Sequence, residues 1–311
     1  MLAYVLSGAA NYGAMQAGAL EVLLASGWKP DMVVGTSAGA LNAIYIASNP
    51  TPEGARELGA IWEEVGPGQV GRGGLFTGLR RVMTRKESLL LNEPLVEFVQ
   101  GHLLPNVNTF GDLAALHQVR AYAMAVCMEN GELVAFGDQE SDRLVDGVLS
   151  STAIPPYFPP WKVDGRRYVD GGVTAKLPIL AANQRGARQV IALDVENTMG
   201  SIQSAKDLFG ISGYALSLMA AHQTHAEIAY SRASGAAVRV ITLPAPVEVS
   251  FWDFSKARRL YRLGNEIAQR ALDVQPLSFP TVWIVRLRSA VRKLVFRLVG
   301  FPAPFGGLYP W

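Results

Sequence analysis

The sequence predicts an α/β fold in which a parallel sheet is covered by helices. Short apolar runs alternate with helix-like runs from the N-terminus onward, and two of these runs lead through glycine-bearing loops into helices. Alternation of this kind is typical of parallel strands joined by crossover helices. Half of the 311 residues are hydrophobic and 17% are charged. That composition excludes a disordered chain and supplies a sizeable core.

The first four elements read as strand, helix, strand and helix. The apolar run at 2–6 predicts a strand, and the residues at 12–26 have helical periodicity that ends at Gly27. A second short strand is expected at 31–34, and a helix at 40–48 is closed by an Asn-Pro pair. The start of the chain therefore has the order expected of a parallel sheet.

The later elements continue this mixture of strands and helices. Two β-rich runs flank a Glu-Asn-Gly turn and predict a hairpin, and the four prolines of 154–161 exclude regular structure there. The expected strands are 120–128, 132–136, 166–169 and 190–193, and the expected helices are 142–153, 205–234 and 256–272. Residues 66–86 are glycine-rich and basic, so that both a lid and a long loop remain open there.

Residues 35–39, Gly-Thr-Ser-Ala-Gly, fit the nucleophile elbow that lies between an apolar strand and an apolar helix. A strand that turns directly into a helix holds the central residue in a strained conformation, and glycines at Gly35 and Gly39 avoid side-chain collisions. Ser37 would then be exposed at a helix N-terminus, where the helix dipole favours a developing anion. The alternative interpretation is a tight turn with an ordinary serine N-cap.

A nucleophilic serine needs a base, and the residues leave several candidates open. Asp170 follows a strand and precedes Gly171 and Gly172, so its carboxylate could reach the same sheet edge as Ser37. The same Asp-Gly-Gly run also fits a common turn. Asp194 is expected at a comparable strand end. Two further candidates are His222 and His225, although their spacing on an expected helix suits a solvated face better than a metal site.

Three stretches in combination resemble the bacterial patatin-like phospholipases over about residues 1 to 200. They are VVGTSAGALNA (33–43), STAIPPYFPP (151–160) and YVDGGV (168–173). The resemblance implies a three-layer α/β/α sandwich with a central, mostly parallel sheet. It also implies hydrolysis of lipid acyl esters through an acyl-enzyme, with Ser37 as nucleophile, Asp170 as base and no histidine. No metal or organic cofactor is implied.

The proposed dyad is physically reasonable. An aspartate in water has a pKa of ~3.9 and is a poor base at neutral pH. In a dry pocket beside Ser37, the pKa of Asp170 would rise and its carboxylate would become a stronger base. Two other functions remain open, a Ser-His-Asp esterase and a non-catalytic protein that binds lipid or another partner on the same fold.

The first loop is similar to the oxyanion loop of that family. Its backbone N–H groups would hold the oxyanion of the tetrahedral intermediate. The expected residues of this oxyanion hole are Gly8, Ala9, Ala10 and Asn11. The family's loop is usually richer in glycine and carries Arg or Lys at the position of Tyr12, and the family often has Asn in the stretch that contains Lys176. A P-loop would need Lys-Ser/Thr after Gly13, and this chain has Ala-Met there.

Charge is unevenly distributed along the chain. From Lys256 onward there are ten Lys/Arg and two Asp/Glu, which give a net charge of +8. Residues 1–255 contain eighteen Lys/Arg and twenty-four Asp/Glu, which give a net charge of −6. We expect a hydrolase domain at 1–275 and a basic amphipathic segment at 276–311. A helix over 281–299 would have an apolar face opposite its cations, which suits either an anionic membrane surface or packing on the core. Nucleic acid is not expected as a partner, because no recognition motif accompanies this segment.

The N-terminus indicates a protein without a signal peptide. No basic region precedes the first apolar run, which is short. No uncharged apolar run approaches the ~18 residues of a membrane-spanning helix. The single cysteine, Cys127, excludes an intrachain disulfide. We therefore expect a cytoplasmic protein, with a peripheral position on the inner face of the membrane as an open alternative.

Overall fold

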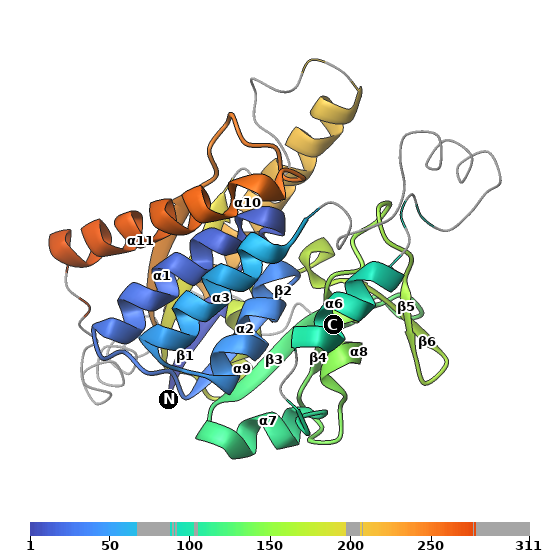
Figure 1. The fold of residues 1–311 in the computed structure, drawn as a ribbon, viewed down its shortest axis with the longest axis horizontal. Coiled ribbons are helices and arrows are strands. Elements are labelled where there is room, and N and C mark those ends of the chain that lie inside the picture. The colour runs from blue at the N-terminus through green and yellow to red at the C-terminus, as the bar shows by residue number, and fades with distance from the viewer. Residues whose placement is uncertain are drawn as a thin grey trace, which may run out of the picture.

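The computed structural model describes residues 1–66, 92–102, 105–196 and 208–275, together with 88, 90, 206 and 277. These residues form a three-layer α/β/α arrangement around one central sheet (Figure 1). The structure confirms the predicted fold class. The stretch 66–86, for which a lid and a long loop were both open, lies outside the described residues apart from Gly66. The expected helix at 281–299 and nearly all of 276–311 lie outside them as well.

The sheet contains eight strands and is mostly parallel. The strands are β1 Leu2–Leu6, β2 Met32–Thr36, β3 Arg120–Cys127, β4 Leu133–Phe136, β5 Trp161–Val163, β6 Arg166–Asp170, β7 Gln189–Glu196 and β8 Ala237–Pro244. Their order is β5-β6-β3-β2-β1-β7-β8, with β4 paired to β3 outside this path. Neighbours from β3 through β8 pair in parallel, whereas β4 and β6 run antiparallel to β3, and β5 runs antiparallel to β6.

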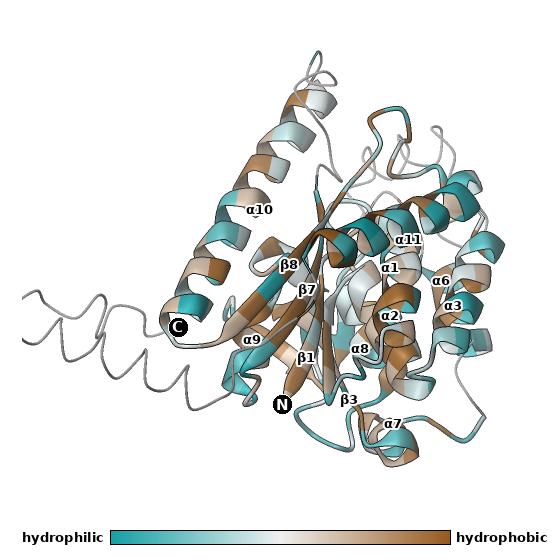
Figure 2. Cartoon of the chain, turned by 90° about the vertical axis from the view of Figure 1, so that its left-hand side faces the viewer, coloured by the Kyte–Doolittle hydropathy of each residue, from teal (hydrophilic) through white to brown (hydrophobic). Residues whose placement is uncertain are grey.

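Helices cover both faces of the sheet. They are α1 Gly13–Ala25, α2 Ala38–Ser48, α3 Pro52–Glu64, α6 Glu93–His102, α7 Phe110–His117, α8 Leu144–Ser151, α9 Ile179–Gln184, α10 Leu208–Ala233 and α11 Ala257–Val274. Figure 2 shows α9 and α10 on one side of the sheet and α1, α2, α3 and α11 on the other. None of the helices in the described residues is both long enough and apolar enough to cross a membrane.

The core has two sides because the central strands are buried on both faces. In β1, Leu2, Tyr4 and Leu6 pack into the cluster that contains α1, α2, α3 and α11. The alternate residues, Ala3 and Val5, pack into a second cluster that contains α9. Period-two alternation normally separates a core face from a solvent face. Here it separates two cores, which explains why the strands read as continuous apolar runs.

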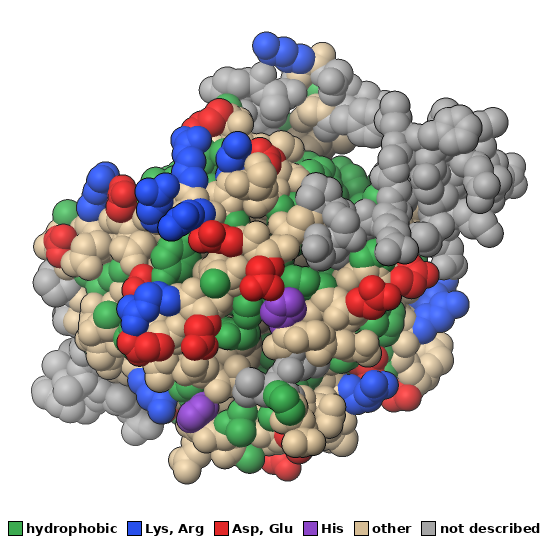
Figure 3. Space-filling view, in the orientation of Figure 1, with side chains coloured by type: hydrophobic (Ala, Val, Ile, Leu, Met, Phe, Trp, Pro, Cys, Tyr) green, Lys and Arg blue, Asp and Glu red, His purple; other side chains and the backbone are tan. Residues whose placement is uncertain are grey.

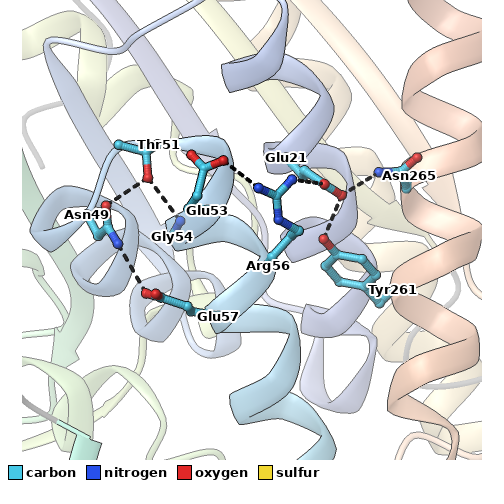
Figure 4. Close-up of polar contacts among 9 residues, drawn as sticks. All are labelled: Glu21, Asn49, Thr51, Glu53, Gly54, Arg56, Glu57, Tyr261 and Asn265. Atoms are coloured by element: carbon cyan, nitrogen blue, oxygen red, sulfur yellow. Dashed lines mark hydrogen bonds and ion pairs between the residues drawn. The ribbon is translucent and has the colours of Figure 1, made fainter.

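Helix α1 lies between the sheet and α11, and this position accounts for its composition. Its residues are buried almost all round, so the expectation of a single apolar face was too narrow. A Cβ on Gly18 would lie 2.0 Å from the carbonyl oxygen of Tyr261, so glycine permits the close approach of α11. Glu21, the half-buried residue of α1, accepts hydrogen bonds from Arg56 on α3 and from Tyr261 and Asn265 on α11 (Figure 4).

The basic excess after Lys256 is partly neutralised on α11. Figure 3 shows one face of the molecule, on which Lys and Arg side chains are grouped in one part and interspersed with Asp and Glu. Arg259 pairs with Glu248, and Arg270 lies 3.6 Å from Glu266. Exposed pairs of this kind contribute little to stability but reduce the local positive charge.

Candidate active site

The ends of β2 and β6 lie next to each other along one edge of β3, and this arrangement brings Ser37 and Asp170 together. In the parallel pairing of β2, Thr36 lies opposite Met124. In the antiparallel pairing of β6, Asp170 lies opposite Ala125, the next residue of β3. Because β4 occupies the other edge of β3 at these residues, β2 and β6 share an edge and end head to head. Ser37, which follows β2, therefore lies beside Asp170, although the two are far apart in sequence.

The turn at Ser37 has the strained geometry expected of an elbow. Ser37 has φ 57° and ψ −125°, a region that non-glycine residues rarely occupy. A Cβ on Gly35 would lie 2.0 Å from the carbonyl oxygen of Gly39, and one on Gly39 would lie 2.4 Å from the carbonyl oxygen of Leu6. Ser37 makes no side-chain cap hydrogen bond to α2, so the N-cap interpretation is wrong. The Ser37 hydroxyl is thus not committed to helix capping.

Ser151 supports the elbow and was not anticipated from the sequence. Its Oγ accepts a hydrogen bond from the Ser37 N–H at 2.9 Å and donates one to the carbonyl oxygen of Met124 at 2.6 Å. Ser151 is fully buried at the C-terminus of α8. It therefore connects the backbone of Ser37 to β3. The only signal in the sequence was its position at the start of the stretch 151–160.

Asp170 has the environment of a base. Its side chain is 2% exposed, and Oδ1 accepts a hydrogen bond from the Gly172 N–H at 2.7 Å. The other oxygen, Oδ2, is buried, and no described residue donates to it in hydrogen-bonding geometry. Burial raises the pKa of Asp170 to about 6, against the opposing effects of the Ser37 hydroxyl and the Gly172 N–H. A Cβ on Gly171 would lie 2.4 Å from the carbonyl oxygen of Met124, which fixes the Asp-Gly-Gly turn against β3.

The competing bases lie in other surroundings. Asp194 is inside β7 and not at its end, and its Oδ1 accepts from Nζ of Lys176 at 2.9 Å. His222 and His225 are exposed on α10. Within the described residues, no histidine hydrogen-bonds to Ser37 or Asp170, and no group of three or more His, Cys, Asp or Glu could hold a metal ion. Asp170 is thus the carboxylate best placed to serve Ser37.

The four residues of the predicted oxyanion hole make different contacts. The Gly8 N–H donates to the carbonyl oxygen of Lys176 at 2.9 Å and is therefore committed. Asn11 does not line the cavity, and its side chain donates through Nδ2 to the carbonyl oxygens of Ser250 and Asp253. Ala9 and Ala10 line the same cavity as Ser37, and no described carbonyl accepts from their N–H groups. These two groups are the donors that an oxyanion could use.

Tyr12 anchors this loop to the later part of the chain. It is 3% exposed, does not line the cavity, and donates its hydroxyl to the carbonyl oxygen of Val249. Burial raises its pKa to about 12, and Coulomb repulsion with Glu248 adds to the rise. The position where the resemblance led us to expect a cation thus holds a buried structural residue. The first loop is fixed to 249–253 through Tyr12 and Asn11.

A buried chain of polar side chains fixes the loop from its other side. Trp62 donates to Asn42 Oδ1 at 2.8 Å, Asn42 donates to Gln16 Oε1 at 2.9 Å, and Gln16 donates to the carbonyl oxygen of Ser7 at 2.9 Å. Ser7, Gln16 and Asn42 have no exposed surface. Such a satisfied buried network favours one conformation of its members. Sequence reasoning missed it, because no local pattern pairs residues from three helices and a loop.

A cavity of about 860 Å³ opens at Ser37 and Asp170. On one side it is bounded by apolar residues of α2, α3, α6, α7 and α8: Leu41, Ile44, Leu58, Ile61, Trp62, Leu95, Phe98, Val99, Leu113, Leu144 and Val148. On the other side it reaches the end of β7 and α10. The polar residues that line it there are Lys176, Asp194, Glu196, Ser217, Gln223, Thr224 and His225, and they lie beside the apolar residues Leu216, Met219, Ala220 and Ala221 of α10. We call these the apolar lobe and the polar lobe. The candidate dyad lies where they join.

Relatives that the chain resembles come from bacteria. It is 28% identical over 229 residues to the uncharacterised protein YqhO of Bacillus subtilis (strain 168), covering 66% of this chain and 77% of that one. It is 30% identical over 156 residues to a cGAMP-activated phospholipase of Pseudomonas aeruginosa (strain BWHPSA011 / Pa011), covering 48% of this chain and 44% of that one. The chain thus spans less than half of that phospholipase's length.

The solved structure of VipD from Legionella pneumophila is similar with a TM-score of 0.49 and 14% identity, over 88% of this chain and 66% of that one. The family model described as patatin-like phospholipase matches residues 4–183, which is more than half of the chain. That range contains the first loop, the elbow and the Asp-Gly-Gly turn. The family implies lipid acyl hydrolase activity. The chain belongs to the patatin-like phospholipase family.

Proposed function

We propose that this protein hydrolyses carboxylic esters of lipids through a Ser37–Asp170 dyad. One observation carries the proposal: Ser37 lies on a strained elbow beside a buried aspartate whose pKa is raised and whose Oδ2 has no other donor. An uncommitted carboxylate oxygen in a dry site is suited to accept the proton of the serine hydroxyl. Family membership supports the choice of lipid esters as substrates.

The reaction has two balanced stages. Asp170 takes the Ser37 Oγ proton while Oγ attacks the ester carbonyl carbon, and the N–H groups of Ala9 and Ala10 hold the resulting oxyanion. The intermediate collapses to an acyl-serine, and Asp170 returns the proton to the leaving alcohol. Water then attacks the acyl-serine with Asp170 as base, which releases the fatty acid and restores the Ser37 hydroxyl.

The two lobes assign the two parts of the substrate. The apolar lobe can bury an acyl chain, and burial of each CH₂ contributes about 0.8 kcal/mol. The polar lobe then receives the alcohol part of the ester. We further propose that the protein acts in the cytoplasm in peripheral contact with a membrane, where lipid esters are available. Truncation at Pro276 should weaken binding to liposomes if 281–299 makes that contact, and unchanged flotation would remove this part of the proposal.

The deciding experiment combines turnover with chemical trapping. Wild-type protein should hydrolyse a short p-nitrophenyl ester, and a fluorophosphonate probe should label the Ser37 peptide in mass spectrometry. Ser37→Ala should lose both signals, and Asp170→Asn should lose turnover while keeping its fold by circular dichroism. Ser150→Ala is a matched control, because Ser150 is buried next to Ser151 but its hydroxyl has no partner. Retained turnover in Ser37→Ala would contradict the mechanism.

The second candidate function is non-catalytic lipid binding on the same fold. It is favoured by the commitment of the Gly8 N–H to Lys176, which leaves fewer donors for an oxyanion. Removal of one oxyanion-hole donor typically costs about 3 kcal/mol of transition-state stabilisation. A purified protein that binds a fatty acyl ester at one-to-one stoichiometry and releases no acid would support this candidate. Turnover that depends on Ser37 would exclude it.

A further inference from the structure

The polar lobe has features of a binding site that the dyad does not use. Thr224 is 4% exposed and lines the cavity, yet no described residue hydrogen-bonds to its Oγ1. Ser217 lines the same cavity, and its Oγ is likewise buried without a partner. The two residues are seven apart on α10, so they lie on the same face two turns from each other. Buried hydroxyls without a partner are uncommon and call for a ligand that satisfies them.

The charged groups of this lobe have the wrong balance for an anion. Among the described residues that line this lobe, Lys176 is the only lysine or arginine and His225 of α10 is the one histidine, whereas Asp170, Asp194 and Glu196 supply three carboxyl groups. The Lys176 ammonium is already paired, because it donates to Asp194 Oδ1 at 2.9 Å and to the carbonyl oxygen of Val195 at 2.6 Å. No ion pair among the described residues involves the carboxylate of Glu196. An anionic group in this lobe would therefore face carboxylates whose charge exceeds that of the cation.

We propose that the polar lobe is a head-group subsite for an uncharged, hydroxyl-bearing alcohol such as glycerol, and that it discriminates against phosphate-bearing head groups. The inference rests on the proposed function, since it assigns the alcohol half of the same ester. Thr224 and Ser217 exchange hydrogen bonds with the hydroxyl groups of the alcohol, which satisfies both partners. Glu196 can accept from one of the two free hydroxyl groups of a 1-acylglycerol and repels a phosphate. This division of roles combines an attractive with a repulsive element, as specific sites commonly do.

The probes share one acyl chain and differ in the head group. They are 1-octanoylglycerol, 1-octanoylglycerol 3-phosphate and ethyl octanoate, each used as a monomeric solution. Dissociation constants are measured on Ser37→Ala by tryptophan fluorescence, because Trp62 and Trp252 line the cavity. We expect 1-octanoylglycerol to bind at least about tenfold more tightly than either of the others, because a site with hydroxyl partners rejects a ligand without them.

Two variants separate the two elements of the subsite. In the Ser37→Ala background, Thr224→Val should reduce the difference in dissociation constant between the glycerol ester and the ethyl ester. Glu196→Gln should reduce the difference in dissociation constant between the glycerol ester and its phosphate. The matched controls are Thr242→Val and Glu97→Gln, which change exposed residues outside the cavity and should leave both differences intact. Equal or tighter binding of the phosphate, no measurable binding of any probe, or differences that neither variant alters would overturn the subsite.

Turnover is measured separately, so that the two proposals fail independently. Acid release by the wild-type protein from the same three probes tests the hydrolase. Selective binding without any acid release would leave the subsite standing and contradict the proposed function. Acid release at equal kcat/KM from the glycerol ester and its phosphate, with equal dissociation constants, would support the hydrolase and overturn the subsite.

Discussion

Replacing Asp170 by asparagine should stabilise the fold at neutral and alkaline pH while it removes activity. The ionised form of Asp170 is penalised by burial, which raises its pKa from 3.8 to about 6. A carboxyl group with a raised pKa binds more protons in the native than in the unfolded state between those two values. Stability therefore falls as the pH rises from 3.8 to 6. The asparagine side chain has no charge to bury and can still accept the Gly172 N–H.

The magnitude follows from the size of the pKa shift. A difference of roughly 2.2 pKa units corresponds to about 3 kcal/mol of unfolding free energy, lost fully by pH 8. At pH 5 only about half of that loss has occurred, so the advantage of Asp170→Asn over wild type should grow by roughly 1–2 kcal/mol between pH 5 and pH 8. The change in this advantage between the two pH values is a better test than the stability difference at one pH, because steric and hydrogen-bonding effects of the asparagine amide are the same at both.

Urea unfolding followed by circular dichroism, at pH 5 and pH 8, measures the difference directly. Wild type and Asp170→Asn are compared at each pH, so that all other titrating groups cancel. Asp194→Asn serves as a contrast, because it leaves the Lys176 ammonium without its partner and should destabilise the protein. The reasoning would be refuted if Asp170→Asn were less stable than wild type at pH 8, or if its advantage did not change between the two pH values. Either result would mean that the buried, ionised carboxylate does not lower the free energy of unfolding.

Three further outcomes follow from the same site. The kcat/KM of ester hydrolysis should rise with pH through a midpoint near 6, because only ionised Asp170 is a base; a profile that is flat from pH 5 to pH 8 would contradict this role. Ser151→Ala should cost about 1–3 kcal/mol in urea unfolding and reduce kcat, because the Ser37 N–H loses its acceptor, whereas Ser150→Ala should be nearly neutral; equal costs would contradict the assignment. Gly39→Ala should cost about 3 kcal/mol or more, because its Cβ would lie 2.4 Å from a carbonyl oxygen, and Gly101→Ala, with open space in α6, should gain about 0.5–1 kcal/mol; the opposite order would refute the steric reasoning.

The sequence was informative where local pattern and tertiary position coincide. The strand at residues 2–6, the elbow around Ser37 and the hairpin after β3 were all predicted, because apolar runs, glycines and turn residues are local signals. The predicted α/β fold followed from their alternation. Helices α3, α6 and α7 and the edge strands β5 and β8 were missed. The expected position of Asp194 at a strand end was also inaccurate, because β7 continues through polar residues whose burial depends on Lys176.

The contacts that complete the site are long-range and could not be predicted from the sequence. The roles of Ser151, Gln16 and Asn42 depend on neighbours from other helices, which no periodicity specifies. Tyr12 was expected to matter through the loss of a cation, whereas it is buried and holds the loop to Val249. The commitment of the Gly8 N–H to Lys176 likewise depends on a turn far along the chain. Local patterns indicated which residues would react, and the tertiary fold determined what surrounds them.

Because β2 and β6 end head to head on β3, that one strand sets the positions of both members of the proposed Ser37–Asp170 dyad. The relative placement of Ser37 and Asp170 depends on two adjacent residues of that one strand, Met124 and Ala125. Insertions in the long intervening chain should therefore be tolerated, whereas a slip of one residue in β6 would turn Asp170 to the opposite face. If Ser37 and Asp170 form the proposed dyad, Ser37 has no base during folding until β6 has docked on β3. The first turnover by a nascent molecule would therefore report the completion of its sheet.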